Sequence, residues 1–446
     1  MSEYLKNLMA RAGARVKAEE ARELEHLRGR PDRLAAYDYF LDLAATGLTP
    51  AAAAARTGRP AVNLLCLQAP LELFQAAGLS PFKVFGGSQA GASLAAQGLP
   101  ALMCPMLKSV LGLSRLRQEE KTSGAAGEVG TSGSSGAIPW VLPTTCDWVV
   151  KYPEMARLAG LSGLDSPGLS GPLHWLELPH VKDREGSQAR WLEEVLRLKD
   201  FLQNLTGRPI TRRALAGAVA VYGRAWRALT GLILLRRAGR IAAPWFFLTT
   251  NVFFGDTVEK WTEAVEKLIP AVAKNPAAGR RVFLAGSPIF FPNFKLPRLM
   301  EEAGLTVAAD DLCSSERLFP GGVDCGDPSE FGLLEALAQR YHQGCLCPTF
   351  ADNDRRVNNI LGQAAPAGPD VPDAPAGVGV GAFEGVVYQV LKGCHPFDLE
   401  SFSVEAALKA AGLKFIRLET DYTAEDSQNL STRLEAFRQT LGVGGI

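Results

Sequence analysis

The 446-residue chain lacks an excess of charge of either sign, because 47 Lys and Arg residues are balanced by 47 Asp and Glu residues. A general nucleic-acid binder normally carries a basic surplus, so the sequence disfavours that class of protein. The apolar share of 47% and the charged share of 21% are typical of a folded globular protein. The length is sufficient for two or three domains.

The chain also lacks a charge-free apolar run of about eighteen residues, the length that a membrane-spanning helix needs. Its strongest candidate, residues 225–248, is interrupted by four arginines, Arg227, Arg236, Arg237 and Arg240. The first twenty residues are charged and have no apolar core, unlike a secretory signal. We therefore expect no membrane association and a cytoplasmic location.

Several familiar site motifs are missing. The sequence has neither a Walker-type G-x-x-x-x-G-K-[ST] motif nor a G-x-G-x-x-G motif after a strand. Paired C-x₂-C units of zinc ribbons and the compact ferredoxin run of cysteines are absent as well. The five histidines form no legible Ser–His–Asp arrangement. If the reaction uses ATP, we expect another protein to bind it.

Cysteines are the chemically distinctive residues that are present. Cys104, Cys146 and Cys394 each follow a short apolar run that predicts a buried strand, at residues 101–103, 140–142 and 386–391. The carboxyl ends of parallel strands face one crevice, where ligands bind. Cys104 also precedes Pro105 at the expected start of a helix, which favours the metal-binding thiolate. In a cytoplasmic protein such cysteines favour metal or redox chemistry over disulfides.

Further candidate ligands are Cys313 and the closely spaced Cys345 and Cys347. The alternative for every cysteine is a small buried apolar side chain, and we favour that interpretation for Cys66 and Cys325.

His395 directly follows Cys394. It is a candidate hydrogen-bond donor to a cluster sulfur or proton donor to a substrate. The alternative is a solvated loop histidine.

Apolar strand-like runs alternate with helical segments, which predicts an α/β fold with mainly parallel sheets. We expect four regions: a helical N-terminal segment at 1–58, a first α/β cluster-binding domain at 59–187, a helical connecting region at 188–280 and a second α/β cluster-binding domain at 281–446. A Gly/Ser/Thr-rich stretch at 119–138 predicts a surface loop.

Eight short segments together carry a family resemblance. They are PLELFQAAG (70–78), Cys104 with Lys108, TCDW (145–148), RVFLAGSP (281–288), EAG (302–304), DDLCSSER (310–317), GCHP (393–396) and TRLEAF (432–437). With them the chain resembles the subunits of 2-hydroxyacyl-CoA dehydratases and benzoyl-CoA reductases, and within that family most closely the double-cubane cluster proteins. The likeness runs from about residue 62 to the C-terminus.

The resemblance implies two Rossmann-like domains with a helical region and an iron–sulfur cluster in the cleft between the domains. The family's three ligands correspond to Cys104, Cys146 and Cys394. Single-cubane members stop there, whereas double-cubane members hold two 4Fe-4S units, joined by a sulfide, on six thiolates. By our inference the additional ligands are Cys313, Cys345 and Cys347.

The resemblance also implies a partner, a separate ATP-hydrolysing iron–sulfur reductase that delivers low-potential electrons. We therefore expect an oxidoreductase, the cluster-bearing component of an ATP-dependent system, that reduces small molecules and forms a homodimer. One alternative is the single 4Fe-4S subunit of a dehydratase or benzoyl-CoA reductase type of enzyme. Another is an electron carrier or cluster-storage protein without a substrate.

Overall fold

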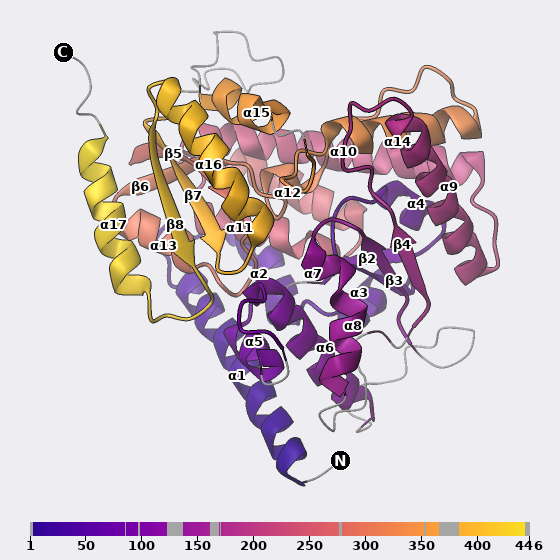
Figure 1. The fold of residues 1–446 in the computed structure, drawn as a ribbon, viewed down its shortest axis with the longest axis horizontal. Helices are drawn as coiled ribbons and strands as arrows, with labels where there is room; N and C mark the ends of the chain where they lie inside the picture. The colour runs from indigo at the N-terminus through magenta and orange to yellow at the C-terminus, as the bar shows by residue number, and fades with distance from the viewer. Residues whose placement is uncertain are drawn as a thin grey trace.

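Two parallel four-stranded sheets form the framework of the computed structural model (Figure 1). The structure describes residues 3–84, 86–96, 99–122, 137–160, 169, 171–275, 279–351, 354–364 and 383–441. The strand orders are β2-β1-β3-β4 in the first sheet and β6-β5-β7-β8 in the second, and every neighbouring pair is parallel. This arrangement confirms the α/β fold with two parallel sheets.

The first sheet and its helices lie between residues 50 and 176. Its strands are β1 (Ala61–Leu64), β2 (Ser80–Lys83), β3 (Trp140–Pro143) and β4 (Leu173–Leu176). The helices of this part are α3 (Pro50–Thr57), α4 (Leu71–Ala76), α5 (Gln89–Ala96), α6 (Pro105–Thr122), α7 (Asp147–Val150) and α8 (Tyr152–Gly160).

The second sheet contains β5 (Arg280–Gly286), β6 (Leu305–Asp310), β7 (Gly385–Leu391) and β8 (Lys414–Thr420). Its helices are α13 (Lys295–Glu302), α14 (Glu330–Gly344), α15 (Asp354–Ala364), α16 (His395–Ala410) and α17 (Ser427–Thr440), with a 3₁₀ turn, η3, at Glu316–Leu318. Every residue of β7 is buried, as expected for an unbroken apolar strand inside a parallel sheet.

The remaining helices fall at the N-terminus and between the sheets in sequence. They are α1 (Glu3–Arg28), η1 (Ala35–Tyr37), α2 (Asp38–Ala45), α9 (Ser187–Thr206), α10 (Arg212–Arg237), α11 (Ala243–Asn251), η2 (Val252–Gly255) and α12 (Val258–Val272). One large apolar core joins residues of these helices to residues of both sheets. By length and composition α10 could cross a membrane, but 44% of its most apolar window is buried within the fold.

One strand expected from the sequence is wrong. Residues 101–103 form a turn instead of a buried strand, and the Leu102 side chain is 76% exposed. The apolar run is only three residues long, too short to distinguish a strand from a turn. Part of the expected loop at 119–138 lies outside the described residues.

Helix α6 packs closely on α5 at Gly112, about two turns after its start. A Cβ atom built at Gly112 would lie 1.9 Å from the carbonyl oxygen of Gly91, so the two helices meet backbone to backbone. Only glycine permits this approach. Because Cys104 immediately precedes α6, this contact helps to set the position of its thiol.

We expect the Gly112→Ala substitution to destabilise the protein by about 1–3 kcal/mol, because the added methyl group overpacks the α5–α6 contact. Gly217→Ala in α10 is the matched control, since a Cβ there meets nothing within 4 Å. It should stabilise the protein by about 0.5–1 kcal/mol through helix propensity. Denaturant unfolding measures both effects, and equal stabilities of the two variants would contradict this packing argument.

Candidate functional site

Three of the candidate cysteines stand at the N-termini of helices. Cys104 directly precedes α6, while Cys146 and Cys394 are the N-cap residues of α7 and α16. The free N–H groups and positive dipole end of a helix N-terminus stabilise a thiolate. Each helix N-terminus therefore favours the thiolate form of the cysteine beside it.

The structure brings these three thiols, which we call the first thiol group, together. Cys104 and Cys394 share a hydrogen bond between their thiols, which lowers the pKa of Cys104 and raises that of Cys394. The charge of Cys146 also acts on Cys104, and that of Cys394 acts on Cys146. Burial raises the pKa of the Cys146 thiol to about 11.

Backbone contacts hold the three cysteine loops against one another. Gly393 has a φ of +74°, and a Cβ there would lie 1.9 Å from the carbonyl oxygen of Leu102. The Trp148 indole Nε1 donates a hydrogen bond to the Gly393 carbonyl oxygen at 3.0 Å. Figure 1 shows α7 and α16, which begin at these loops, on the same side of the molecule. The His395 ring lies 5.8 Å from the Trp148 ring and is exposed beside this group.

A second thiol group contains Cys66, Cys313, Cys345 and Cys347. The charges of Cys313 and Cys347 act on both Cys66 and Cys345, and burial raises the pKa of Cys347 to about 11. Cys66 joins a group that the sequence analysis expected for the other three alone. The sequence contains one indication of this placement, because Cys66 follows the buried strand β1 just as Cys146 follows β3.

The two groups belong to adjoining loops. The Thr349 hydroxyl, beside Cys347, donates a hydrogen bond to the carbonyl oxygen of Thr145, beside Cys146. Cys66 and Cys146 follow strands of the first sheet, whereas Cys313 and Cys394 follow strands of the second sheet. The carboxyl edges of the two sheets therefore face each other and carry members of both groups, while Cys104, Cys345 and Cys347 come from loops that follow helices. Cys325 is separate, with its thiol donating to the carbonyl oxygen of Asp327 at 2.8 Å.

Two arginines, Arg356 buried and Arg317 half-buried, border the second thiol group. Arg317 and Arg356 both donate to the carbonyl oxygen of Leu346, between Cys345 and Cys347. Both also pair with the buried carboxylate of Asp311. The Nη2 atom of each arginine is buried and has no hydrogen-bond partner among the residues that the structure describes.

These residues fit an iron–sulfur cluster by the chemistry of their donors. Both groups consist of thiols, and thiolates select soft metals and iron–sulfur clusters over oxygen-seeking cations. In the described part of the chain, no three His, Cys, Asp or Glu side chains are grouped to hold one metal ion. A cubane does not require such a group, because each thiolate binds a different iron atom. The unpartnered arginine N–H groups are suited to an anionic neighbour.

The family model of 2-hydroxyglutaryl-CoA dehydratase, D-component, matches residues 66–441. The chain belongs to this dehydratase family. It is similar to the putative dehydratase subunit YjiM of Escherichia coli, with 26% identity over 92% of this chain and 99% of the relative. It is also similar to the beta subunit of (R)-2-hydroxyglutaryl-CoA dehydratase of Acidaminococcus fermentans, with 22% identity over 86% of this chain and 93% of the relative. A third relative is the lactoyl-CoA dehydratase subunit beta of Anaerotignum propionicum, with 22% identity over 87% of this chain and 93% of the relative.

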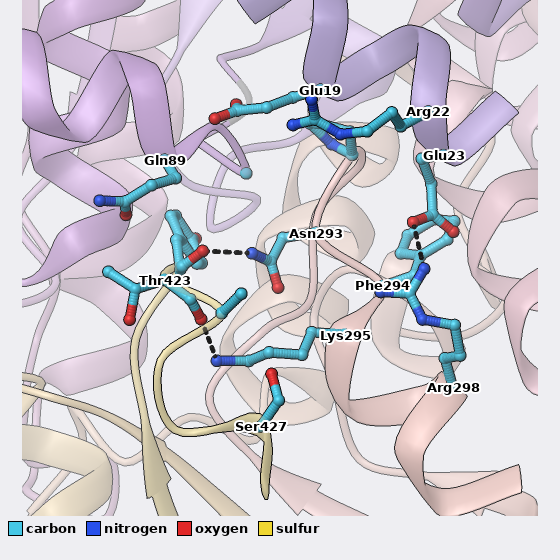
Figure 2. Close-up of a pocket in the computed structure, with 14 residues that line it drawn as sticks. Glu19, Arg22, Glu23, Gln89, Asn293, Phe294, Lys295, Arg298, Thr423 and Ser427 are labelled. Atoms are coloured by element: carbon cyan, nitrogen blue, oxygen red, sulfur yellow. Dashed lines mark hydrogen bonds and ion pairs between the residues drawn. The ribbon is translucent and has the colours of Figure 1, made fainter. Parts of the chain in front are cut away.

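In this dehydratase-family chain a cavity of about 400 Å³ lies near the first thiol group. Figure 2 shows Glu19, Arg22 and Glu23 of α1 on one side. Facing them are Asn293 and Thr423, from loops beside the second sheet, and Lys295, the first residue of α13. Tyr422 also lines the cavity and packs in one apolar cluster with Cys104 and Leu391. Its hydroxyl is buried without a partner among the described residues.

Glu23 is the unusual carboxyl group of this cavity. Arg298 Nη1 donates to its Oε2 atom at 3.2 Å, while the buried Oε1 atom has no partner among the described residues. Burial outweighs the attraction of Arg298 and Arg30 and raises the pKa of Glu23 to about 7. The side chain therefore exchanges a proton near neutral pH.

We expect the Glu23→Gln substitution to change how stability depends on pH. A carboxyl group whose pKa is raised on folding destabilises the protein as pH rises from its unfolded pKa to its folded pKa, here from 4.5 to about 7. The variant should lack this decline. Between pH 4 and pH 8 its free energy of unfolding should therefore rise, relative to that of the wild type, by up to about 3 kcal/mol. Denaturant unfolding across pH measures the difference.

Glu25→Gln, at an exposed position of α1, should follow the wild-type profile. Parallel profiles for the wild type and Glu23→Gln would contradict the raised pKa.

Proposed function

We propose that this chain is the cluster-bearing component of an iron–sulfur reductase. It accepts low-potential single electrons from a separate ATP-hydrolysing iron–sulfur reductase and reduces small molecules. The observation that supports this most is the pair of adjoining all-thiol groups at the facing carboxyl edges of the two sheets. A homodimer in the cytoplasm is part of the proposal.

In this proposal the first thiol group binds one 4Fe-4S unit through Cys104, Cys146 and Cys394. Three of the four thiols of Cys66, Cys313, Cys345 and Cys347 would hold the second unit. When bound, the cluster stores electrons at low potential, because burial disfavours added negative charge. That low potential is the reason an ATP-driven donor is required.

The chain's own groups orient and protect the first thiols. Backbone N–H groups of Met106 and Leu107 stabilise the charge of Cys104, and those of Trp148 and Val149 stabilise that of Cys146. Ser287 does the same for Cys394 through its hydroxyl. His395 is exposed beside these thiols, in a position to supply protons to a substrate.

A second candidate is a dehydratase subunit with one 4Fe-4S unit on the first thiol group. The names of the relatives, which are beta subunits of dehydratases, favour it. Iron and sulfide analysis of protein purified without oxygen separates the two candidates. About eight irons per chain would support the double cluster, whereas about four would exclude the second 4Fe-4S unit. Tight binding of a CoA thioester and a requirement for a sister subunit would favour the dehydratase.

We expect Cys146→Ala to abolish or strongly reduce iron binding under either candidate, because each uses this thiol as a ligand. Cys325→Ala is the matched control, since its thiol belongs to neither group and should leave the iron content unchanged. Metal analysis after anaerobic purification gives the result. Full iron content in Cys146→Ala would show that Cys146 is not a ligand.

The Gly393→Ala substitution tests the contact between the cysteine loops. The added methyl group would collide with the Leu102 carbonyl and separate Cys394 from Cys104, so we expect most of the iron to be lost. Gly412→Ala has nearly the same φ, +73°, but a Cβ there meets nothing within 4 Å. It should cost about 1–2 kcal/mol of stability and keep its iron. Equal iron contents in the two variants would refute this role of Gly393.

A further inference from the structure

The two thiol groups differ in the charges that surround them. In the first group, backbone N–H groups and the Ser287 hydroxyl stabilise the thiolates, although the pKa values of Cys146 and Cys394 remain raised. The Lys108 ammonium interacts with the charge of Cys104, but it donates to the carbonyl oxygen of Ala101 at 2.7 Å. The first group is therefore stabilised mainly by partial charges.

Full positive charges surround the second group. The Lys83 ammonium lies 3.9 Å from the Cys313 sulfur, and Lys182 donates to the carbonyl oxygen of Cys345. Both lysines are buried, with only 4% and 8% of their surface exposed. Each ammonium also lies over an aromatic ring, Lys83 over Phe290 and Lys182 over Phe350. These contacts keep the ammonium groups close to the thiols and away from water.

Arg317 and Arg356 add two further cations at the Leu346 carbonyl. The acidic partners do not cancel them, because among the described residues only Asp311 and Glu400 form ion pairs with this set. Four cations therefore face two carboxylates around the second thiol group. Since these groups are buried, solvent and salt screen the imbalance far less than at the surface.

We propose that Lys83, Lys182, Arg317 and Arg356 are positioning residues that make the second thiol group the electron-holding half of the site. The inference rests on the proposed function, and it adds which half receives the electron. Transfer of one electron from a single-electron iron–sulfur reductant would make and break no bond and would add one negative charge to the cluster held by these thiols. The cations stabilise that negative charge, so the added electron is held beside Cys313, Cys345 and Cys347. The first half, beside exposed His395 and the cavity at Tyr422, then faces the substrate.

The test replaces each lysine by methionine, which keeps the length of the side chain and removes its charge. Lys83→Met and Lys182→Met are titrated against potential, with the EPR signal of the reduced cluster as the readout and the iron content measured in parallel. At the potential that half-reduces the wild type, the ratio of reduced to oxidised cluster should fall about tenfold in each variant. Lys83→Arg keeps the charge and should retain a near-wild-type ratio.

Lys151→Met is the control for a general loss of charge. Its ammonium follows α7 but is 60% exposed and pairs with Glu154, so its removal should leave the ratio unchanged. A wild-type ratio in both Lys83→Met and Lys182→Met at full iron content would overturn the proposal, as would an equal fall in Lys151→Met. If one methionine variant does not fold, the other decides the result. A wild-type protein without iron would refute the proposed function itself.

Discussion

The contact between the carboxyl edges of two parallel sheets is the constraint on which the site depends. Gly393 packs against the Leu102 carbonyl, and the Thr349 hydroxyl donates to Thr145. Another close approach places Gly87 against the carbonyl of Phe290, where a Cβ would lie at 2.3 Å. Each contact joins a loop of one sheet to a loop of the other part of the chain. Thiols that are distant in sequence become neighbours as a result.

Gathering the thiols in one place makes their ionisation unfavourable, and groups around them offset part of this cost. Thiols gathered in a buried place resist ionisation, as the raised pKa values of Cys146 and Cys347 show. Helix N-termini offset this cost in the first group, while lysines and arginines offset it in the second. These are two physically different ways to hold negative charge, which gives the site an inherent asymmetry.

The sequence predicts the parts of the site that depend on local pattern. The unbroken apolar run of β7 places Cys394, and the run of β3 places Cys146. The strand predicted before Cys104 is wrong, because three apolar residues do not determine an extended conformation. Cys66 also follows a buried strand, but this position alone does not distinguish a member of a thiol group from a small apolar residue.

Long-range contacts account for what the sequence leaves unpredicted. Lys182 reaches Cys345 across 163 residues, and Lys83 reaches Cys313 across 230. No periodicity or motif links such positions, so only the folded structure shows that these cations lie beside the second thiol group. The family resemblance predicted the thiol ligands but carried no information about these charges.

Anomalous diffraction at the iron absorption edge, from crystals of protein purified without oxygen, tests the central claim most directly. The account predicts iron within bonding distance of Cys104, Cys146 and Cys394, and further iron beside Cys313 and the loop of Cys345 and Cys347. Crystals in which these thiols are scattered, or lie together with no iron between them, would contradict it.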